Sequence, residues 1–354
     1  MTRHYSNLKF LNYPKHLAAV RSGEMVAPVH VRIKPMNWCN HNCWYCAYRS
    51  DNVQLGEGID LRDRIPDDRM FEIIDDIVDM GVEAVTFSGG GEPLLYKALP
   101  ECIEKLAAGG VSVATLTNGV NLAGNMAEAF AKHGTWVRIS MDAWDDDSYQ
   151  KSRGAKPGEF DKMVSNIANF KALETDCVLG VSFIIGHDNH EHVLDMCKML
   201  KDAGASHVKL SGVGVANDPT ENNIYHDEIR DTVTAQISAA EDLVDEEFGV
   251  LNHYHDFAER FEKTYETCPY LKYLTVIGAD LKVYACQDKA YTDSGLLGSL
   301  EGRGFKEFWF SNENKERINH LNPSKSCQHH CITHAKNLTI NEFMSIDPAH
   351  GKFV

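Results

Sequence analysis

The chain has no long apolar run and no excess of positive charge, and both absences limit its function. No hydrophobic stretch approaches the ~20 residues that a membrane-spanning helix needs, and the N-terminal MTRHYSNLKF lacks the apolar core of a secretory signal. Among 354 residues, 51 acids outnumber 35 lysines and arginines, which gives a net charge of −16. Nucleic-acid-binding proteins usually carry a basic stripe. We therefore expect a cytoplasmic protein with no nucleic acid and no membrane as partner, although a few local cations would suffice for a small phosphorylated ligand.

Cysteine, by contrast, is abundant for a chain without an export signal. Disulfides are typical of secreted proteins, so closely spaced cysteines in this chain indicate metal binding instead. The ten cysteines are Cys39, Cys43, Cys46, Cys102, Cys177, Cys197, Cys268, Cys286, Cys327 and Cys331.

Short β-rich runs alternate with helical patterns and predict an α/β fold with a parallel sheet and right-handed connections. Six such units are too few for a closed eight-unit barrel, so we expect an open, partial (βα)6 barrel with ligands at the carboxyl ends of its strands. The predicted strands are 29–35, 82–87, 111–116, 136–141, 178–185 and 207–211. The predicted helices between them are 67–80, 99–108, 126–133, 161–174 and 192–202.

The chain after the sixth strand changes in texture. We expect a polar loop over 214–225, helical patterns over 226–247 and 256–266, and a hairpin of 274–277 with 282–285. The predicted organisation is an N-terminal extension (1–27), a barrel (28–261) and a smaller C-terminal domain (262–354).

Three cysteines lie directly after the first predicted strand, in the run WCNHNCWYC. Cys39, Cys43 and Cys46 fall within eight residues, and thiolates are the ligands that hold iron–sulfur clusters. A four-iron cluster held by three cysteines leaves one iron without a protein ligand, free to bind a substrate or cofactor. A zinc site that adds His41 is the alternative.

This CxxxCxxC motif, with Tyr45 before its last cysteine, resembles the signature of radical S-adenosylmethionine (SAM) enzymes. Further motifs of that superfamily follow in register with the predicted strands, and the resemblance covers residues 28–215. They are Gly89-Gly90-Gly91-Glu92-Pro93, Asn118-Gly119, Ser140 with Asp142, Arg153-Gly154, and the segment 180–191 with Asn189.

The resemblance implies a partial barrel of the radical SAM type, with a [4Fe-4S] cluster on Cys39, Cys43 and Cys46 that binds SAM. An electron from a reductant such as flavodoxin or ferredoxin would split SAM into methionine and a 5′-deoxyadenosyl radical. The glycines would let the backbone approach the methionine moiety closely. The resemblance places the following residues at SAM: Tyr45 near adenine, Gly89, Gly90, Gly91, Glu92 at the methionine ammonium, Asn118, Ser140, Asp142, Arg153 and Asn189.

Four more cysteines lie in the C-terminal part. Cys268 and Cys286 flank the predicted hairpin, and Cys327 and Cys331 follow as CQHHC. The layout resembles the SPASM/twitch region of the same superfamily, which implies an auxiliary [4Fe-4S] cluster on these four thiolates. The final Cx3C differs from the more common Cx2C. A four-cysteine zinc site stays open, as does replacement of one cysteine by a histidine: His329, His330 or His334.

The remaining candidates are single residues. We expect Cys102, Cys177 and Cys197 to be core thiols, although a lone cysteine donates hydrogen in some radical epimerases. His30, Arg32 and Lys34 share one face of the first strand, where a cation would meet either substrate or a neighbouring helix. His187, after the fifth strand, is the candidate catalytic base.

Together these features predict a radical SAM oxidoreductase. It would abstract hydrogen from a small polar, carbohydrate-like substrate, with oxidation assisted by the auxiliary cluster. The alternatives are a radical SAM epimerase or rearrangement enzyme, a peptide-modifying maturase, and a non-catalytic electron-transfer or metal-binding protein. The last would leave the glycine-rich and strand-end motifs unexplained.

Overall fold

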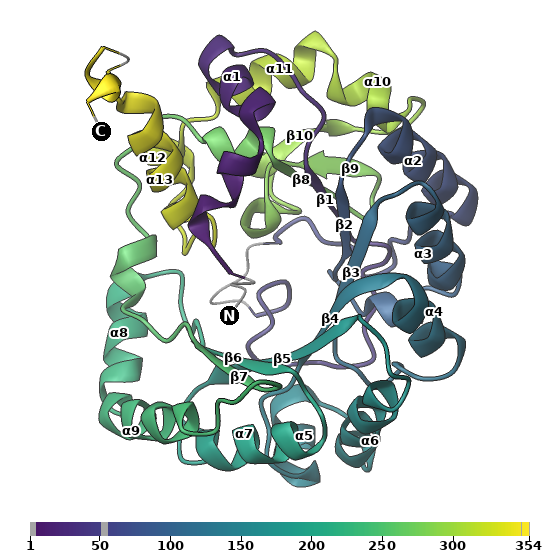
Figure 1. Cartoon of the computed structure of the whole chain (residues 1–354), viewed down its shortest axis with the longest axis vertical. Coiled ribbons are helices and arrows are strands. Elements are labelled where there is room, and N and C mark those ends of the chain that lie inside the picture. The colour runs from purple at the N-terminus through teal and green to yellow at the C-terminus, as the bar shows by residue number, and fades with distance from the viewer. Residues whose placement is uncertain (1–4, 51–55, 348, 354) are drawn as a thin grey trace.

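One curved sheet organises the molecule (Figure 1). A computed structural model describes residues 5–50, 56–347 and 349–353. In it ten strands follow the order β10-β9-β8-β1-β2-β3-β4-β5-β6-β7. Every neighbouring pair from β8 to β7 is parallel, whereas β9 and β10 are antiparallel additions. The strands are β1 (His30–Ile33), β2 (Ala84–Phe87), β3 (Ser112–Thr117), β4 (Gly134–Ser140), β5 (Val178–Ile185), β6 (His207–Gly212), β7 (Gly249–Asn252), β8 (Leu274–Ile277), β9 (Lys282–Tyr284) and β10 (Leu296–Ser299).

The sheet is open, because within the described residues its edge strands β7 and β10 do not pair with each other. This confirms the predicted partial barrel of the α/β class. The six predicted strands are β1 to β6, and each lies where the sequence pattern expected it to within about two or three residues.

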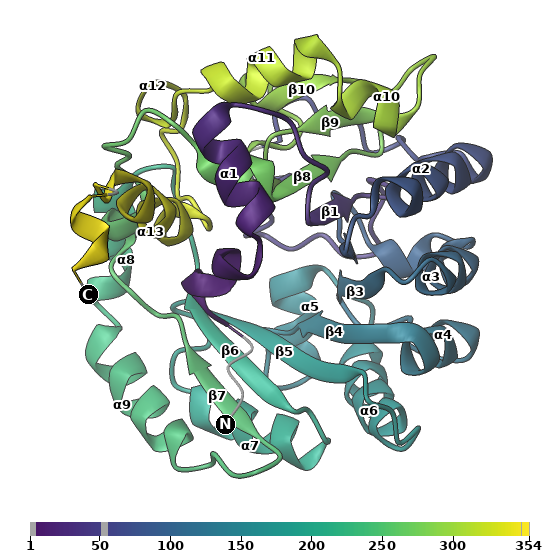
Figure 2. The same ribbon diagram turned by 45° about the horizontal axis from the view of Figure 1, so that its top comes forward.

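Helices cover the outer face of this sheet (Figures 1 and 2). Helix α2 shows why: its apolar residues Met70, Ile73, Ile74 and Ile77 recur at helical spacing and are buried. None of the helices in the described parts of the chain combines the length and apolarity needed to cross a membrane. The helices are α1 (Pro14–Ser22), α2 (Asp67–Met80), α3 (Leu99–Ala108), α4 (Asn125–His133), α5 (Asp146–Arg153), α6 (Glu159–Lys171), α7 (Val193–Asp202), α8 (Pro219–Asp227), α9 (Arg230–Glu241), α10 (Phe305–Trp309), α11 (Asn312–His320), α12 (Pro323–Ser326) and α13 (His334–Ser345).

Three expectations after β6 were wrong. The predicted loop 214–225 contains most of α8, which begins at Pro219 because the Asp218 carboxylate accepts a hydrogen bond from the Glu221 N–H, 2.9 Å away. The single helical pattern 226–247 is divided between α8 and α9, and 256–266 forms only the 3-10 turn Phe257–Arg260. Strands β7 and β10 were not predicted.

The C-terminal segment joins the same sheet instead of lying apart from it. The predicted hairpin is β8 and β9, and β8 pairs in parallel with β1, with Leu274 opposite His30. Phe10 near the N-terminus packs with Tyr273 and with Ile340 of α13. The domain boundary at residue 262 stays a prediction. The pairing of β8 with β1 shows that the C-terminal segment is hydrogen-bonded directly to the barrel.

Because β1 is paired on both edges, loss of its core contacts should affect the whole sheet. Ile33 is fully buried. We expect Ile33→Ala to lower the free energy of unfolding by about 2–5 kcal/mol, the usual cost of a large-to-small core substitution. Leu173→Ala, at a side chain that is 43% exposed, should change it by no more than about 0.5 kcal/mol. Urea denaturation of both variants measures this, and equal losses would contradict the central role of β1.

Candidate functional site

The loop with the first three cysteines is held on two sides, by the segment that follows β2 and by the end of α5. On one side the Gly91 and Glu92 N–H groups donate to the carbonyls of Met36 and Trp38, at 3.1 and 3.0 Å. On the other, the Asn42 N–H donates to the Arg153 carbonyl at 2.7 Å. The loop therefore lies at the carboxyl end of β1, the edge at which ligands were expected.

Cys39, Cys43 and Cys46 in this loop are half-buried and free of disulfides. Burial, with smaller contributions from Glu92 and Cys43, raises the pKa of the Cys39 thiol to about 12. Burial likewise raises the pKa of Cys43, and the charge of Cys46 adds to this effect. Three adjacent thiols of this kind suit a multinuclear iron–sulfur cluster, whose positive irons would stabilise the thiolates.

The glycine run is required by the protein's own backbone. A Cβ atom on Gly91 would lie 1.9 Å from the Trp38 carbonyl oxygen, and one on Gly90 would lie 2.2 Å from Asn37 Oδ1. A Cβ on Gly89 would lie 1.5 Å from the Gly91 carbonyl oxygen. The close approach that the glycines permit is therefore, in the structure, an approach to the cysteine loop. Their expected contact with the methionine moiety stays a prediction.

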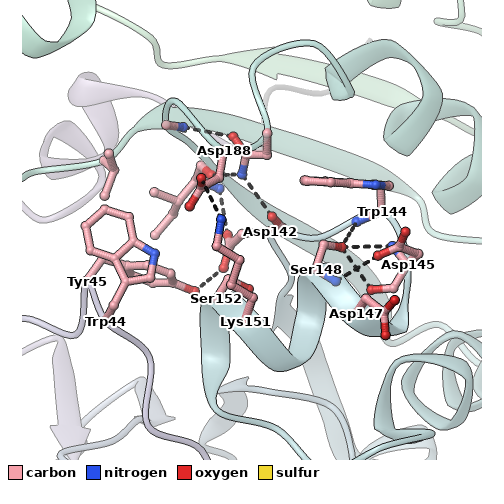
Figure 3. Close-up of a pocket in the computed structure, with 14 residues that line it drawn as sticks. Trp44, Tyr45, Asp142, Trp144, Asp145, Asp147, Ser148, Lys151, Ser152 and Asp188 are labelled. Carbon is pink, nitrogen blue, oxygen red and sulfur yellow. Dashed lines mark hydrogen bonds and ion pairs between the residues drawn. The ribbon is translucent and has the colours of Figure 1, made fainter.

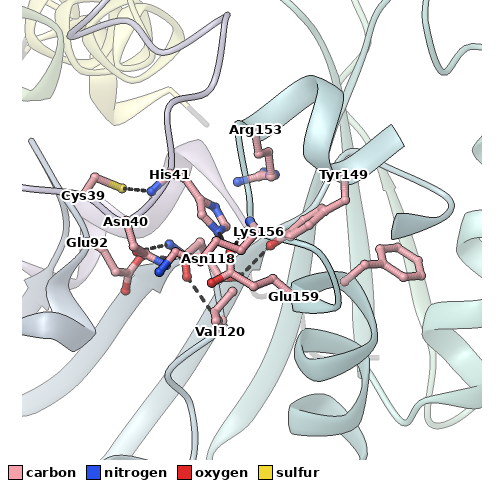
Figure 4. Close-up of polar contacts among 12 residues, drawn as sticks. Cys39, Asn40, His41, Glu92, Asn118, Val120, Tyr149, Arg153, Lys156 and Glu159 are labelled. Atoms are coloured by element: carbon pink, nitrogen blue, oxygen red, sulfur yellow. Dashed lines mark hydrogen bonds and ion pairs between the residues drawn. The ribbon is translucent and has the colours of Figure 1, made fainter. Parts of the chain in front are cut away.

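Glu92 ties this loop to the end of β3 (Figure 4). Its carboxylate accepts hydrogen bonds from Thr117 Oγ1 at 2.5 Å, from the Asn118 N–H at 2.8 Å and from the Leu94 N–H at 3.0 Å. Burial raises the pKa of this carboxyl, while the three hydrogen bonds oppose the rise. Asn118 in turn donates to Asn40 Oδ1 at 2.8 Å, so both predicted SAM-binding residues hold the cysteine loop in place.

Asp142, just after β4, accepts three hydrogen bonds, as Glu92 does. One oxygen accepts from the Arg153 guanidinium and from the Tyr45 hydroxyl, and the other accepts from the Ile184 N–H at 2.7 Å. Arg153 also lies 3.8 Å from Cys43 Sγ. Both members of the ion pair are almost fully buried. The predicted residues Tyr45, Asp142 and Arg153 therefore form one cluster that joins the cysteine loop to β4, α5 and β5.

A cavity of about 260 Å³ lies beside this cluster (Figure 3). Tyr45, Asp142 and Asn189 line it together with the apolar Ile184 and Val213. Its walls thus include Tyr45, which the resemblance places near adenine, and apolar walls with a few polar groups are typical of small-molecule sites.

Asn189 is buried at this cavity and fully used. It accepts from the Gly186 N–H at 2.8 Å and donates to the carbonyls of Asp142 and Ile184 at 2.9 Å each. Ser140, also predicted at SAM, is half-buried on β4 opposite Ser182 of β5. Its contact with SAM stays a prediction.

Two histidines were considered for chemical roles, His41 as a zinc ligand and His187 as a base, and both contact other protein groups in the structure. His41 Nε2 is 3.1 Å from the Glu159 carboxylate (Figure 4), which favours a role in anchoring α6 over the zinc alternative. His187 stacks on Tyr225 with 4.0 Å between ring centroids, and its Nε2 lies 2.6 Å from the Tyr225 carbonyl oxygen. The cavity of Figure 3 is not lined by His187, and its role as a base stays a prediction.

The four C-terminal cysteines converge although they come from three separate segments. Cys268, Cys286, Cys327 and Cys331 line one small cavity. Burial raises the pKa of the Cys286 thiol, and Asp288 and the other three cysteines raise it further. Four mutually close thiols are the donor set of a [4Fe-4S] cluster and of a zinc site alike.

The surroundings of these cysteines are basic. Lys263 and Lys289 line the same cavity, and their ammonium groups are held by carbonyls, as in the 2.5 Å hydrogen bond from Lys289 to Ser326. His329 is the histidine alternative found in the lining, and its buried Nε2 lacks a hydrogen-bond partner among the described residues. His334 instead lies 3.1 Å from the Tyr265 hydroxyl. No group of three His, Cys, Asp or Glu side chains in the described ranges has the arrangement of a single-ion site.

A pair of residues missed at the sequence level connects the two cysteine groups. Tyr48 follows Cys46, Gln287 follows Cys286, and the Tyr48 hydroxyl donates to the Gln287 carbonyl at 3.2 Å. Gln287 Nε2 donates back to that hydroxyl, and Lys34 donates to it at 2.9 Å. The available sequence signal was proximity to a predicted ligand cysteine: Gln287 directly follows Cys286, and Tyr48 lies two residues after Cys46. The two predicted cluster loops are thus joined by direct hydrogen bonds.

Comparison with known proteins identifies the barrel. Residues 33–200 match the model of the Radical SAM superfamily. A GTP 3′,8-cyclase of Xanthomonas campestris pv. campestris (strain 8004) is 34% identical over 157 residues, which cover 42% of this chain and 45% of that protein. An S-adenosylmethionine-dependent nucleotide dehydratase of Lacinutrix mariniflava is 29% identical over 121 residues, 34% of this chain and 25% of that protein. The chain therefore spans less than half the length of these two relatives in the matched regions.

Solved structures extend the likeness to the whole fold. SuiB of Streptococcus suis bound to S-adenosylmethionine has a TM-score of 0.61 at 14% identity, with 98% of this chain and 82% of SuiB covered. Native anSMEcpe with bound AdoMet has a TM-score of 0.58 at 18% identity, with 89% and 95% covered. At such low identity these matches speak for the fold alone.

The buried Asp142–Arg153 pair generates a prediction on stability. Asp142→Asn keeps an acceptor for the Ile184 N–H but leaves the Arg153 charge buried and unpaired, so we expect a loss of about 3–5 kcal/mol in the free energy of unfolding. The matched control is Asp188→Asn, which breaks the exposed 3.0 Å pair with Lys151 and should cost no more than about 1 kcal/mol. Urea denaturation compares them, and equal costs would contradict the clamp described above.

Proposed function

Since residues 33–200 place this chain in the radical SAM superfamily, we propose that it is a radical SAM oxidoreductase acting on a small polar substrate. The observation that carries the proposal is the convergence of Cys268, Cys286, Cys327 and Cys331 on one cavity, hydrogen-bonded through Gln287 and Tyr48 to the first cysteine loop. A second redox centre at these cysteines would accept the electron that an oxidation releases, whereas a redox-neutral reaction has no such electron to remove.

The superfamily uses a [4Fe-4S] cluster and SAM, and the residues present fit both. Cys39, Cys43 and Cys46 would hold the cluster, and burial raises the pKa of the Cys39 and Cys43 thiols in the metal-free chain. When bound, cluster and SAM together supply a 5′-deoxyadenosyl radical that takes a hydrogen atom from the substrate. The chain's own part is to fix the loop through Glu92 and Asp142 and to keep water out through Ile184 and Val213.

The auxiliary site is part of this proposal. Its four cysteines would hold a second [4Fe-4S] cluster, and Lys263 and Lys289 would offset the negative charge of four thiolates. When bound, this cluster supplies a one-electron acceptor. An oxidised product would be lighter than the substrate by two hydrogen atoms, with one SAM consumed per turnover.

An epimerase is the closest alternative. Epimerases of this superfamily that use a lone cysteine need its thiol at the substrate. Cys102 and Cys197 are fully buried and Cys177 is 5% exposed, all within the helix-covered core, and burial raises the pKa of each to about 12. This burial confirms them as core thiols and favours oxidation over a cysteine-dependent epimerisation. Unchanged product mass with solvent deuterium incorporated would identify an epimerase instead.

A peptide substrate is a second alternative, because SuiB has been solved with the precursor peptide SuiA and anSMEcpe with the Kp18Cys peptide. The curated relatives are named for acting on GTP or on a nucleotide. These relatives are the more similar in sequence, and they support a small-molecule substrate. Deuterium transfer into 5′-deoxyadenosine from labelled small molecules, against labelled peptides, separates the two.

Cysteine substitutions test the division of labour. We expect Cys43→Ala to abolish SAM cleavage, because one of three ligands is lost. Cys286→Ala should leave uncoupled cleavage detectable but stop substrate turnover. Cys197→Ala, a buried core cysteine, is the control and should retain cleavage. The measurement is 5′-deoxyadenosine formation by anaerobically reconstituted protein after reduction, and full cleavage by Cys43→Ala would overturn the assignment of the first cluster.

Metal content tests the auxiliary site separately. Two four-iron clusters require about eight irons per chain, so we expect about eight in the wild type and about four in Cys286→Ala after reconstitution. Iron and zinc are measured together by elemental analysis. About four irons with one zinc in the wild type would support the zinc alternative at the C-terminal cysteines.

A further inference from the structure

The inner face of the barrel carries more positive charge than the described acids near it balance. In β1, β4 and β6 the residues on either side of Arg32, Arg138 and Lys209 are buried under the helices: Val31, Ile33, Val137, Ile139, Val208 and Leu210. Side chains alternate along a strand, so these three cations point to the opposite, inner face. Arg260, at the end of the turn after β7, completes what we call the inner cation cluster (Arg32, Arg138, Lys209 and Arg260).

The members of the inner cation cluster lie close enough to repel one another. Burial, and then the charges of Arg138, Arg260 and Arg32, lowers the pKa of Lys209 to about 8. Burial and then Arg138 lower the pKa of Arg32. Burial, followed by Lys209 and Arg260, also lowers the pKa of nearby His253 to about 4. Three strands and one turn, far apart in the sequence, thus bring their cations close together.

Partners for these charges are missing from the part of the chain that the structure describes. No carboxylate there lies within 4.0 Å of any of the four cations. The Nε atoms of Arg32 and Arg138 are buried without a hydrogen-bond partner, and the recorded bond of Arg138 is a 3.3 Å contact to the Tyr5 hydroxyl. Asp288 is the carboxylate whose charge acts on Arg32. Glu259 and Asp288 both act on Arg260, and these two acids against four cations leave a net positive charge.

The predicted metal sites account for only part of this charge, since among the cysteines it is Cys331 whose charge acts on a member of the cluster, Arg260. The C-terminal cysteines have Lys263 and Lys289 in their own lining, and the first cysteine loop has Arg153, 3.8 Å from Cys43 Sγ. A need for solubility does not explain these cations either, because the chain as a whole already carries a net charge of −16. Half-buried, unpaired cations oppose folding, and such arrangements mark sites where a ligand brings the opposite charge.

We propose that the inner cation cluster binds a phosphate or diphosphate group of the substrate. The inference rests on the proposed function and narrows its substrate class to phosphorylated small molecules. A single carboxylate would balance one of four cations, whereas a diphosphate matches several at once. Arginine suits this task because its planar guanidinium can bind two phosphate oxygens together. Arg260 ties the site to the auxiliary cysteines, since its carbonyl accepts a 3.1 Å hydrogen bond from the Cys331 N–H.

Binding of inorganic pyrophosphate to the SAM-loaded, reconstituted holoenzyme tests the inference. Isothermal titration calorimetry should show binding that weakens as ionic strength rises. We expect Lys209→Gln and Arg138→Gln each to weaken it about tenfold or more, a loss of about 1.4 kcal/mol. The control is Lys198→Gln, at an exposed lysine of α7 paired only with Asp195 at 3.5 Å, which should bind like the wild type.

Thermal unfolding distinguishes an anion-binding lysine from a purely structural one. Removal of one repelling charge should raise the melting temperature of Lys209→Gln above that of the wild type without pyrophosphate, and the stabilisation by pyrophosphate should shrink. A lower melting temperature without the anion would overturn the inference, as would equal pyrophosphate affinity in wild type and Lys209→Gln.

Separate outcomes test the phosphate assignment and the proposed oxidoreductase function. Tricarballylate, a tricarboxylate, should bind more weakly than pyrophosphate; tighter binding would overturn the phosphate assignment. Wild-type SAM cleavage without pyrophosphate binding would overturn this inference and leave the proposed function standing. Pyrophosphate binding with a product of unchanged mass would uphold the anion site and overturn oxidation as the reaction.

Discussion

The double pairing of β1 is the constraint on which the rest of the structure depends. This four-residue strand is hydrogen-bonded to β2 on one edge and to β8 on the other. A loop that leaves its carboxyl end must therefore emerge between the barrel and the C-terminal segment. That loop carries Cys39, Cys43 and Cys46, and the next strand of the C-terminal side, β9, leads directly to Cys286. The distance between the two predicted clusters is thus set by main-chain pairing, which is the least adjustable part of the fold.

Polar side chains then lock the loop from three directions. Glu92 holds it to β3, Asp142 with Arg153 holds it to β4 and α5, and Tyr48 holds it to Gln287. Glu92 and Asp142 are buried and Tyr48 is half-buried, and each has several partners. This specifies one geometry, because a misplaced loop would leave those groups unsatisfied. Several residues that a family motif assigns to the cofactor thus have a demonstrable role in shaping the loop itself, and the two roles are compatible because a carboxylate oxygen accepts more than one hydrogen bond.

Sequence patterns predicted the local features well and the convergent ones poorly. Apolar periodicity, with Gly81 as the stop signal of α2, predicts the bounds of α2 and β5. The spacing of its cysteines identifies the CxxxCxxC loop. Helix α8 was missed because the Asp218-Pro219 start signal was outweighed by the polar residues around it. β7 and β10 were missed because each contains a glycine and neither alternates buried with exposed residues. Lys209 and Arg260 gave no signal, since an isolated basic residue in a strand or turn becomes meaningful only when the sheet curves and brings others beside it.

Net charge misleads for the same reason. A value of −16 averages over the whole molecule, yet the exposed acids of α2 and α9 lie on the outer, solvated face, where water and salt screen them within about 10 Å. Charges on the inner face sit between protein walls, where screening is weaker and a few cations dominate the local field. A few cations on the inner face can therefore create a local positive field although the molecule as a whole is acidic. The alternation of side chains across a single curved sheet is sufficient to separate the two fields.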